Sequence, residues 1–426
     1  MEFLQIYFEN FFHFAITWWW LLLPFFMYPI MKGLWIYDLY ARHFQNNPYV
    51  VLSVKVPKEQ ERSPQLMEYV LHGIWNLYGE KRHEMDTWVF GVFEDYVSLE
   101  IAAVEGKVYF GVWVRKIKSE FVMSHIYAHF PQAEIEVLEN DYLDFLPDNI
   151  PNKDWDLWGT HLTLQKSDVY PIRTYPKFED SKKGEMVDPL AILMEMGSET
   201  GPGEFFLVQL LIQAIPGGEW HDKFKEEMEK ILDRGKAREP YSAKQDLIRH
   251  FGTLPWDTVY AIFKYPEFES TMSEQEQKEK EALMFRLSPG EHEAIKEMER
   301  SHEKKSFLAQ YAFMYAARRE SFNPAKFVGG IFGAINQFGT EELNQFLPFF
   351  PYMSSSKYWF EKSRIAFIKR RLVRLLKNRQ YQAANYILNA EEVATLWHFP
   401  DLTVKSPKTP WVEDRKASAP TNLPIE

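Results

Sequence analysis

The hydrophobic and polar positions divide the chain into one long apolar run followed by short alternating segments. The run lies between Glu9 and Lys32 and holds no formally charged side chain. At about 1.5 Å of rise per residue, a helix of this length crosses the roughly 30 Å hydrocarbon layer of a bilayer once. The pattern therefore predicts a single transmembrane helix within an N-terminal anchor at residues 1–40. The residues expected to span the membrane are Phe11, Phe14, Trp18, Trp19, Trp20, Leu22, Phe25 and Ile30.

The flanks of this run favour an uncleaved anchor over a secretory signal. Glu2 and Glu9 precede it, whereas a signal peptide begins with basic residues and ends at a small-residue cleavage site. Lys32 and Arg42 follow it, so the positive-inside rule places the rest of the chain in the cytoplasm. We expect a single-pass protein of the cell inner (cytoplasmic) membrane with membrane lipid as one partner. The alternative is a buried, aromatic-rich core helix.

From residue 48 the pattern changes to short elements. One helix follows Ser63 and Pro64, another begins at Ser119, and a tight turn at Glu105-Gly106 joins two strands. Alternating or β-branched runs predict four strands, at 49–56, 97–103, 108–114 and 133–138. The order β-α-β-β-α-β is typical of a ferredoxin-like module, here over residues 48–140.

The same order recurs over residues 158–350. Its elements are a strand near 159–166, a helix that Asp188 caps, strands at 205–215 and 307–317, a helix from Pro324 and an apolar run at 346–350. A charged insertion at about 219–303 interrupts this second module. A basic helical segment at 355–400 and a Pro-rich extended tail at 401–426 complete the chain. We therefore expect an α+β fold: a transmembrane helix, two ferredoxin-like modules, the second with a long insertion, and a basic helical segment.

Two groups of side chains are candidates for binding. The basic segment accumulates cations beside an apolar stripe, and its candidate anion contacts are Lys369, Arg370, Arg371, Arg374 and Lys377. The alternative for these cations is a solvated helix face. Tyr109 and Trp113 share one face of a strand, where aromatic rings stack on bases in RNA-recognition sheets. The alternative for both rings is burial in a core or an interface.

Composition excludes several kinds of chemistry. The chain has no cysteine, which excludes disulfides, thiolate metal sites and cysteine nucleophiles. Its net charge of −11 argues against a protein that coats nucleic acid through its whole surface. Gly106-Lys107 and Gly235-Lys236 lack the upstream glycine and the following Ser or Thr of a P-loop. We expect no enzymatic activity and no catalytic, metal or cofactor site.

The histidines do not change that expectation. Glu299 and His302 have the E-x-x-H spacing of a carboxylate metal site, but such a site needs a second copy and further glutamates on facing helices. A solvated helix face is the simpler interpretation. His398, between Trp397 and Phe399, is interpreted as a packed histidine because no partner stands at ligand spacing.

Several short sequence segments along the chain resemble those of a known family. They include Ile126-Tyr127-Ala128-His129-Phe130-Pro131, Tyr170-Pro171-Ile172-Arg173-Thr174-Tyr175, and Ala394 to Pro400 (ATLWHFP) followed by Ala419 to Pro424 (APTNLP). They resemble an uncharacterised membrane-anchored family of small-genome, uncultivated bacteria, associated with type IV secretion or conjugative DNA transfer. In longer relatives this region precedes a coupling-protein-like ATPase domain, which does not follow here. The resemblance implies an architecture and a context but no catalytic residue.

Together these observations lead to one expected function and two alternatives. The expected function is a non-enzymatic, membrane-anchored scaffold or docking subunit for a separate P-loop transport ATPase, with the tail as the docking strand. The first alternative is a membrane-tethered nucleic-acid-binding module that uses Tyr109, Trp113 and the basic helix. The second is a membrane scaffold unrelated to secretion. A homo-oligomer is compatible with all three.

Overall fold

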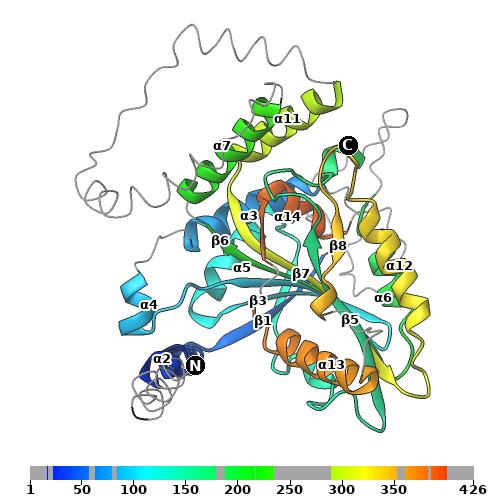
Figure 1. The fold of residues 1–426 in the computed structure, drawn as a ribbon. Helices are drawn as coiled ribbons and strands as arrows, with labels where there is room; N and C mark the ends of the chain where they lie inside the picture. The colour runs from blue at the N-terminus through cyan, green and yellow to red at the C-terminus, as the bar shows by residue number, and fades with distance from the viewer. Residues whose placement is uncertain are drawn as a thin grey trace, which may run out of the picture.

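A single antiparallel sheet of nine strands organises the molecule (Figure 1). The computed structural model describes residues 17, 23–56, 63–78, 84–178, 188–215, 217–234, 289–352, 360–381 and 385–400. The strands are β1 (Tyr49–Lys55), β2 (Val97–Val104), β3 (Lys107–Arg115), β4 (Glu134–Val137), β5 (Trp155–Leu164), β6 (Glu204–Ala214), β7 (Ser306–Arg318), β8 (Phe346–Pro348) and β9 (Tyr386–Asn389). Their order is β4-β1-β3-β2-β6-β7-β5-β8, and β9 pairs with β7.

The sheet consists of two halves with the same strand arrangement. The first half has the order β4-β1-β3-β2, and the second half repeats it outward from the centre as β6-β7-β5-β8. The halves join where β2 pairs with β6 along eight residues, from Val97↔Ile212 to Val104↔Phe205. The elements predicted for two modules therefore share one continuous sheet, and the α+β class holds.

Helices cover both faces of this sheet. The described helices are α2 (Leu23–Asn46), α3 (Gln65–Tyr78), α4 (Glu84–Phe90), α5 (Ser119–His129), α6 (Ala191–Ser198), α7 (Gly217–Arg234), α11 (Pro289–His302), α12 (Pro324–Asn336), α13 (Glu361–Lys377) and α14 (Ala390–Leu396). Short 3-10 turns are η2 (Lys116–Lys118), η3 (Tyr142–Phe145), η4 (Tyr175–Phe178) and η5 (Phe350–Tyr352).

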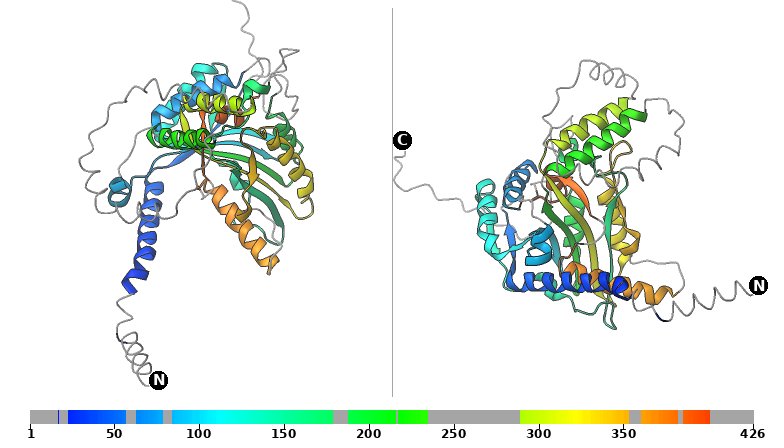
Figure 2. Two further views of the ribbon diagram at one scale, coloured as in Figure 1. Left: turned by 45° about the horizontal axis from the view of Figure 1, so that its top comes forward. Right: turned by 60° about the vertical axis from the view of Figure 1, so that its left-hand side comes forward.

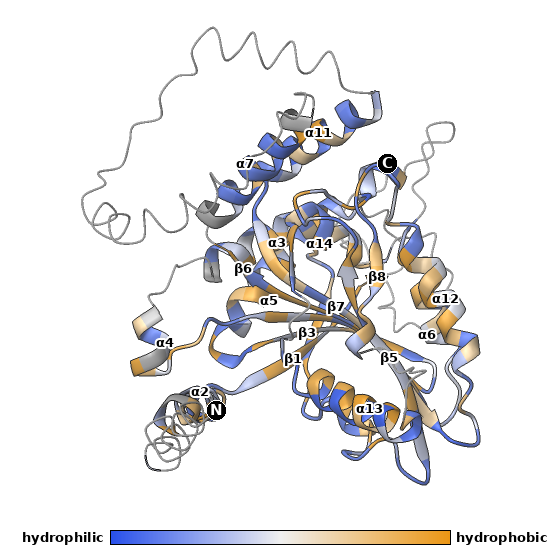
Figure 3. Cartoon of the chain, viewed as in Figure 1, coloured by the Kyte–Doolittle hydropathy of each residue, from blue (hydrophilic) through white to orange (hydrophobic). Residues whose placement is uncertain are grey.

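The larger core lies between the sheet and α3, α5, α6, α12 and α14. The second core lies on the opposite face, where η3 and the apolar side of α13 pack on the sheet through residues such as Leu143 and Leu372. Because both faces are covered, the central strands β6 and β7 are buried almost along their whole length. Helices α7 and α11, which lie at the two ends of the predicted insertion, pack on each other and are largely hydrophilic (Figure 3).

Local sequence explains several element boundaries. The predicted turn between β2 and β3 forms at Glu105 and Gly106, which both take positive φ, +51° and +87°. This conformation matches the right-handed twist of a two-residue hairpin. Helix α14 begins with a capping box, in which Asn389 and Glu392 satisfy each other's backbone N–H groups.

The first element of the predicted fold is wrong. No helix within the described ranges is long and apolar enough to cross a membrane. Within the described residues helix α2 extends from Leu23 to Asn46, so that Lys32, Asp38 and Arg42 lie along its length. This finding contradicts the predicted transmembrane helix and, with it, the single-pass location in the inner membrane.

Two of the residues predicted to span the membrane fall on α2, and the other six lie outside the described residues. Ile30 lies on α2 and is 61% exposed. Phe25 falls within α2 without a described side chain. Phe11, Phe14, Trp18, Trp19, Trp20 and Leu22 lie outside the described residues, as do the predicted tail at 401–426 and most of the predicted insertion.

Candidate functional site

Helix α2 is fixed to the sheet at its C-terminal end by a buried carboxylate. Asp95 is 3% exposed, and it receives hydrogen bonds from Arg115 (3.1 Å) and Tyr49 (3.4 Å) and an ion pair from Lys118 (2.8 Å). The imidazole Nε2 of His43, on α2, lies 3.8 Å from the same carboxylate. Burial alone would raise the pKa of Asp95, but these donors and cations outweigh it and hold the pKa far below its usual range. The carboxylate is thus charged and joins α2 to β3.

An aromatic stack continues this attachment. Phe44 of α2 stacks on Tyr49, and Tyr49 stacks on Trp113 with ring centroids 4.0 Å apart. The guanidinium of Arg379 lies 5.4 Å from the Trp113 ring. Trp113, a candidate for base stacking, is 8% exposed and packs internally. The other candidate, Tyr109, is half-buried and packs beside Tyr142.

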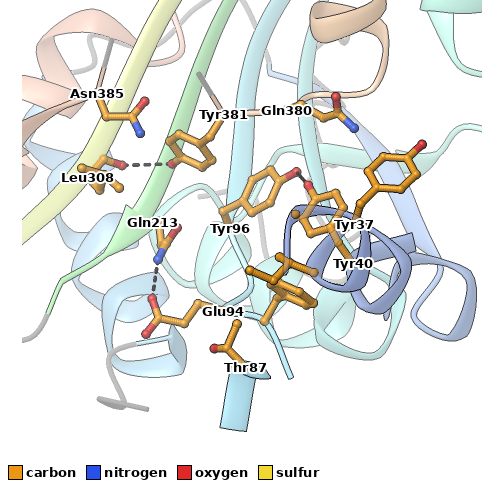
Figure 4. Close-up of a pocket in the computed structure, with 13 residues that line it drawn as sticks. Tyr37, Tyr40, Thr87, Glu94, Tyr96, Gln213, Leu308, Gln380, Tyr381 and Asn385 are labelled. Atoms are coloured by element: carbon orange, nitrogen blue, oxygen red, sulfur yellow. Dashed lines mark hydrogen bonds between the residues drawn. The ribbon is translucent and has the colours of Figure 1, made fainter. Parts of the chain in front are cut away.

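A cavity of about 730 Å³ opens where α2 leaves the sheet (Figure 4). Five of the thirteen described lining residues are aromatic, and Tyr40 and Tyr96 point toward each other with their hydroxyl oxygens 3.3 Å apart. We name it the tyrosine pocket; its lining is Gly33, Ile36, Tyr37, Tyr40, Thr87, Phe93, Glu94, Tyr96, Gln213, Leu308, Gln380, Tyr381 and Asn385. The volume lies within the range of small-molecule and side-chain sites, about 300–1,000 Å³.

Glu94 is the one charged side chain in the described lining of the tyrosine pocket. Its carboxylate accepts a hydrogen bond from the amide of Gln213, which orients it (Figure 4). Burial raises the pKa of Tyr40 and of Tyr96, so both phenols stay neutral. Tyr381 donates its hydroxyl to the carbonyl oxygen of Leu308 at 3.0 Å. The pocket therefore combines neutral aromatic walls with one negative charge.

The described lining contains few of the side chains that commonly act as bases or nucleophiles. Among the described lining residues there is no histidine, lysine or cysteine to serve as base or nucleophile. The one aliphatic hydroxyl, that of Thr87, donates to the Val92 carbonyl at 3.4 Å. Within the described part of the chain, no group of three or more His, Asp or Glu residues is placed to hold a metal ion.

The predicted basic helix is α13, and its cations divide into two sets. Lys369 pairs with Asp156 (2.6 Å) and Lys377 with Asp148 (2.7 Å), so these two lysines hold α13 to neighbouring segments. Arg370, Arg371 and Arg374 lie on the exposed side of the helix. The structure thus leaves the three arginines as the part of the predicted anion surface that faces solvent.

A buried charged network, which sequence reasoning missed, follows directly after α13. Arg379 is 3% exposed, and its guanidinium donates to Glu100 (2.7 and 3.0 Å) and to Asp141 (2.6 and 3.1 Å). Tyr142 also donates to Glu100, and Gln209 reaches it at 2.9 Å. Glu100 and Gln209 are register partners in β2 and β6, so this cluster, the Arg379 network, lies where the two halves of the sheet join.

One feature of the sequence indicates this network, although weakly. A charged residue at the centre of a strongly apolar strand, as Glu100 is in β2, needs a buried partner. The partner could not be identified because Arg379 is 279 positions away.

A second charged cluster ties α3, α11 and α14 together. Lys304 bonds to Glu68 (2.8 Å) and to Glu391, and Arg300 bonds to Glu391 (3.1 Å). The adjoining cavity is only about 10 Å³, too small for a ligand. His302, which was predicted on a solvated helix face, is half-buried: it stacks on Phe224, and its Nε2 lies 2.7 Å from Nδ1 of His221.

A comparison with protein families identifies a family for this chain. The model of a domain of unknown function, DUF8128, matches residues 39–412, most of the chain. The match begins at the part of α2 that contacts the sheet, and it includes the tyrosine pocket from Tyr40 onward, the Arg379 network and α13. No curated protein matches the sequence. Neither finding supports the link to secretion or conjugation that the resemblance implied.

Proposed function

This chain belongs to the DUF8128 family of domains of unknown function, and on that premise we propose that it is a non-enzymatic docking module. In this proposal, the tyrosine pocket receives a basic side chain, lysine or arginine, from a segment of a protein partner. The observation that carries the proposal is the combination of aromatic walls with Glu94 as the one charged group in the described lining.

The chemistry of the lining favours a cation. An ammonium or guanidinium over an aromatic face gains about 0.5–2 kcal/mol, and more when it is desolvated. A carboxylate at the same site adds a charge-assisted hydrogen bond, which an uncharged ligand cannot form. Gln380, Asn385 and Thr87 add amide and hydroxyl groups to the lining, suited to the backbone of the segment that carries the basic residue.

The resemblance described above suggests a partner. A separate P-loop transport ATPase is the first protein to test, and a basic segment on its surface is the expected ligand.

The proposal is tested with small probes of the expected ligand. The full chain is titrated calorimetrically with Nα-acetyl-lysine methylamide and with Nα-acetyl-norleucine methylamide, which lacks the ammonium group. We expect the lysine probe to bind and the norleucine probe not to bind. Glu94→Gln should weaken lysine binding about 10–100-fold, because a charge-assisted hydrogen bond contributes about 1.5–3 kcal/mol. Glu139→Gln, an exposed carboxylate outside the pocket lining, is the matched control. Equal binding of both probes, or no effect of Glu94→Gln, would overturn the proposal.

A second candidate function is nucleic-acid binding through α13. The observation that favours it is the exposed row of Arg370, Arg371 and Arg374, which could neutralise backbone phosphates.

A further inference from the structure

The aromatic rings of the tyrosine pocket meet at right angles. Tyr40 and Phe93 pack edge to face, with ring centroids 5.1 Å apart and planes at 86°, and Tyr96 and Tyr381 pack in the same way at 5.0 Å and 76°. These rings come from α2, which projects from the body of the molecule (Figure 2), from the segment before β2 and from the connection after α13. Ring faces are electron-rich and attract cations. Rings at right angles contact a rounded cationic group from more than one side.

The polar groups of the lining supply one anionic acceptor. The hydroxyl groups of Tyr381 and Thr87 donate to backbone carbonyls, as described above. The amide side chains of Gln380 and Asn385 lie away from Glu94 (Figure 4). A cation beside Glu94 therefore has this carboxylate as its one charged partner within the described lining.

The number of N–H groups on the cation decides how well it suits this lining. The ammonium of unmethylated lysine has three N–H donors, and a donor that loses water without gaining an acceptor costs free energy. Each N-methyl group removes one donor and adds apolar surface, while the nitrogen keeps its positive charge. A dimethylated lysine keeps one N–H, which matches the one anionic acceptor, and presents two methyl groups to the rings.

We infer that the basic side chain received by the tyrosine pocket is a dimethylated lysine. This inference rests on the proposed function and names the chemical form of the ligand. Glu94 accepts the remaining N–H, and the aromatic rings contact the two methyl groups. The cavity of about 730 Å³ leaves room for these groups.

Calorimetric titration of the full chain with a methylation series tests the inference. The probes are Nα-acetyl-lysine methylamide and its Nε-monomethyl, dimethyl and trimethyl forms. The dimethyl probe should bind about 15-fold more tightly than the unmethylated one, because each buried methyl group contributes about fourfold. The trimethyl probe should bind about 3–25-fold more weakly than the dimethyl one. It gains a methyl group but loses a charge-assisted hydrogen bond that contributes about 10–100-fold.

A substitution at Glu94 separates the hydrogen bond from the methyl contacts. Glu94→Gln should weaken the dimethyl probe more than the trimethyl probe, because only the dimethyl form donates an N–H to the carboxylate. Glu139→Gln, outside the pocket lining, should change neither affinity. Equal weakening of both probes by Glu94→Gln would overturn the assignment of the N–H to Glu94.

A substitution at Tyr37 tests the contact between the rings and the methyl groups. Tyr37 lines the pocket and is 69% exposed, so its replacement leaves the core unchanged. Tyr37→Leu should weaken the dimethyl probe about 2–5-fold, as expected for the loss of one exposed cation–π contact. Tyr28→Leu is the matched control on the same helix, because Tyr28 is 64% exposed and lies outside the lining. The same affinity in both variants would contradict contact with the rings.

The methylation series also distinguishes this inference from the function on which it rests. If the unmethylated probe binds through Glu94 and methylation adds no affinity, the inference is wrong and the proposed docking of a basic side chain stands. If the trimethyl probe binds as tightly as the dimethyl probe, the inference is likewise wrong. If none of the probes binds, both the inference and the proposed function are wrong.

Discussion

At the scale of single residues, Arg379 combines a costly backbone conformation with a buried charge. Its φ is +50°, in the left-handed region that favours glycine. It occupies the position just past α13 where glycine commonly ends a helix, and the N–H groups of Arg379 and Gln380 bond back to Leu376 and Leu375. The guanidinium holds this arginine in place by bonding to Glu100 and Asp141. The Arg379 network thus fixes the end of α13 on the joint of the sheet.

Removing one charged partner from the Arg379 network should strongly destabilise the folded state. Glu100→Gln leaves the buried Arg379 with Asp141 as its remaining carboxylate, and we expect a loss of about 3–5 kcal/mol in the free energy of unfolding. Urea denaturation measures it, with the exposed Glu139→Gln as control. The double substitution Glu100→Leu/Arg379→Met should recover most of the loss, because an apolar pair needs no charge compensation. A Glu100→Gln variant as stable as the control would contradict this role.

A second buried carboxylate should make stability depend on pH. Burial raises the pKa of Glu392 to about 8, although the N–H groups of Asn389 and Ile172 bond to it. Between pH ~4.5, where the unfolded chain releases this proton, and pH 8, the folded state keeps it. Stability contributed by Glu392 is therefore present at low pH and falls as pH rises, by up to about 1.4 kcal/mol per pH unit.

The comparison with Glu392→Gln isolates this effect. All other titrating groups are shared, so the difference in unfolding free energy between wild type and variant should shift against the wild type from pH 5 to pH 8. Urea denaturation at both values measures it. The same difference at both pH values would show that the carboxyl titrates normally in the folded protein.

At the scale of elements, α13 separates structural from exposed cations. We predict that Arg370→Glu/Arg374→Glu abolishes binding of single-stranded oligothymidine, because both side chains are exposed while Lys369 and Lys377 are used internally. Fluorescence anisotropy between 50 and 200 mM salt measures affinity and its salt slope, which changes by about 0.7 per phosphate contact. Lys225→Glu/Lys296→Glu, on the exposed sides of α7 and α11, is the matched charge reversal. A wild type that does not bind at low salt would end this candidate.

The sequence predicted the strands and most helices because their signals are local. The turn at Glu105-Gly106, the strands at 205–215 and 307–317 and the helix from Pro324 all lie within a few residues of the observed elements. Alternation, turn residues and a proline in the first turn depend only on neighbours. The short strand β9 was not predicted; its four residues carry too little pattern.

The prediction of a transmembrane helix near the N-terminus is wrong because it rests on the hydrophobic composition of the run and not on where the helix ends. Hydrophobicity alone does not distinguish a spanning helix from one that leaves the apolar run and joins a sheet. Helix α2 does the latter, and its last turns carry His43 and Phe44 into the sheet.

The tyrosine pocket could not be predicted at all. Its walls come from α2, from the segment before β2, from β6, from β7 and from the connection after α13. These segments meet only because β2 pairs with β6 and β6 with β7. Because the lining residues come from five separate segments, they form no motif of fixed spacing by which the pocket could be recognised in the sequence.

At the scale of the whole molecule, the two halves form one structural unit. Neither half has a free inner edge, since β2 and β6 satisfy each other's backbone groups along eight residues. The Arg379 network crosses this joint, and the Trp397 ring N–H donates to the carbonyl of Glu100 at 3.1 Å. The residues that directly follow α13 and α14 thus contact the middle of the sheet, and separation of the halves would expose both an open edge and buried charges.

We therefore predict that the halves unfold together. Phe313→Ala in β7 removes a fully buried ring from the second half, at a cost of about 3–5 kcal/mol. If the halves form a single cooperative unit, this substitution should lower the free energy of protection from native-state hydrogen exchange equally in both halves. Amides of β3, such as that of Val112, should then lose as much protection as amides of β7. Phe367→Ala on α13, where the ring is exposed, is the matched control and should change neither. If β3 kept its protection while β7 lost it, the halves would be separate folding units that only share an edge, and the Arg379 network would be a contact between domains.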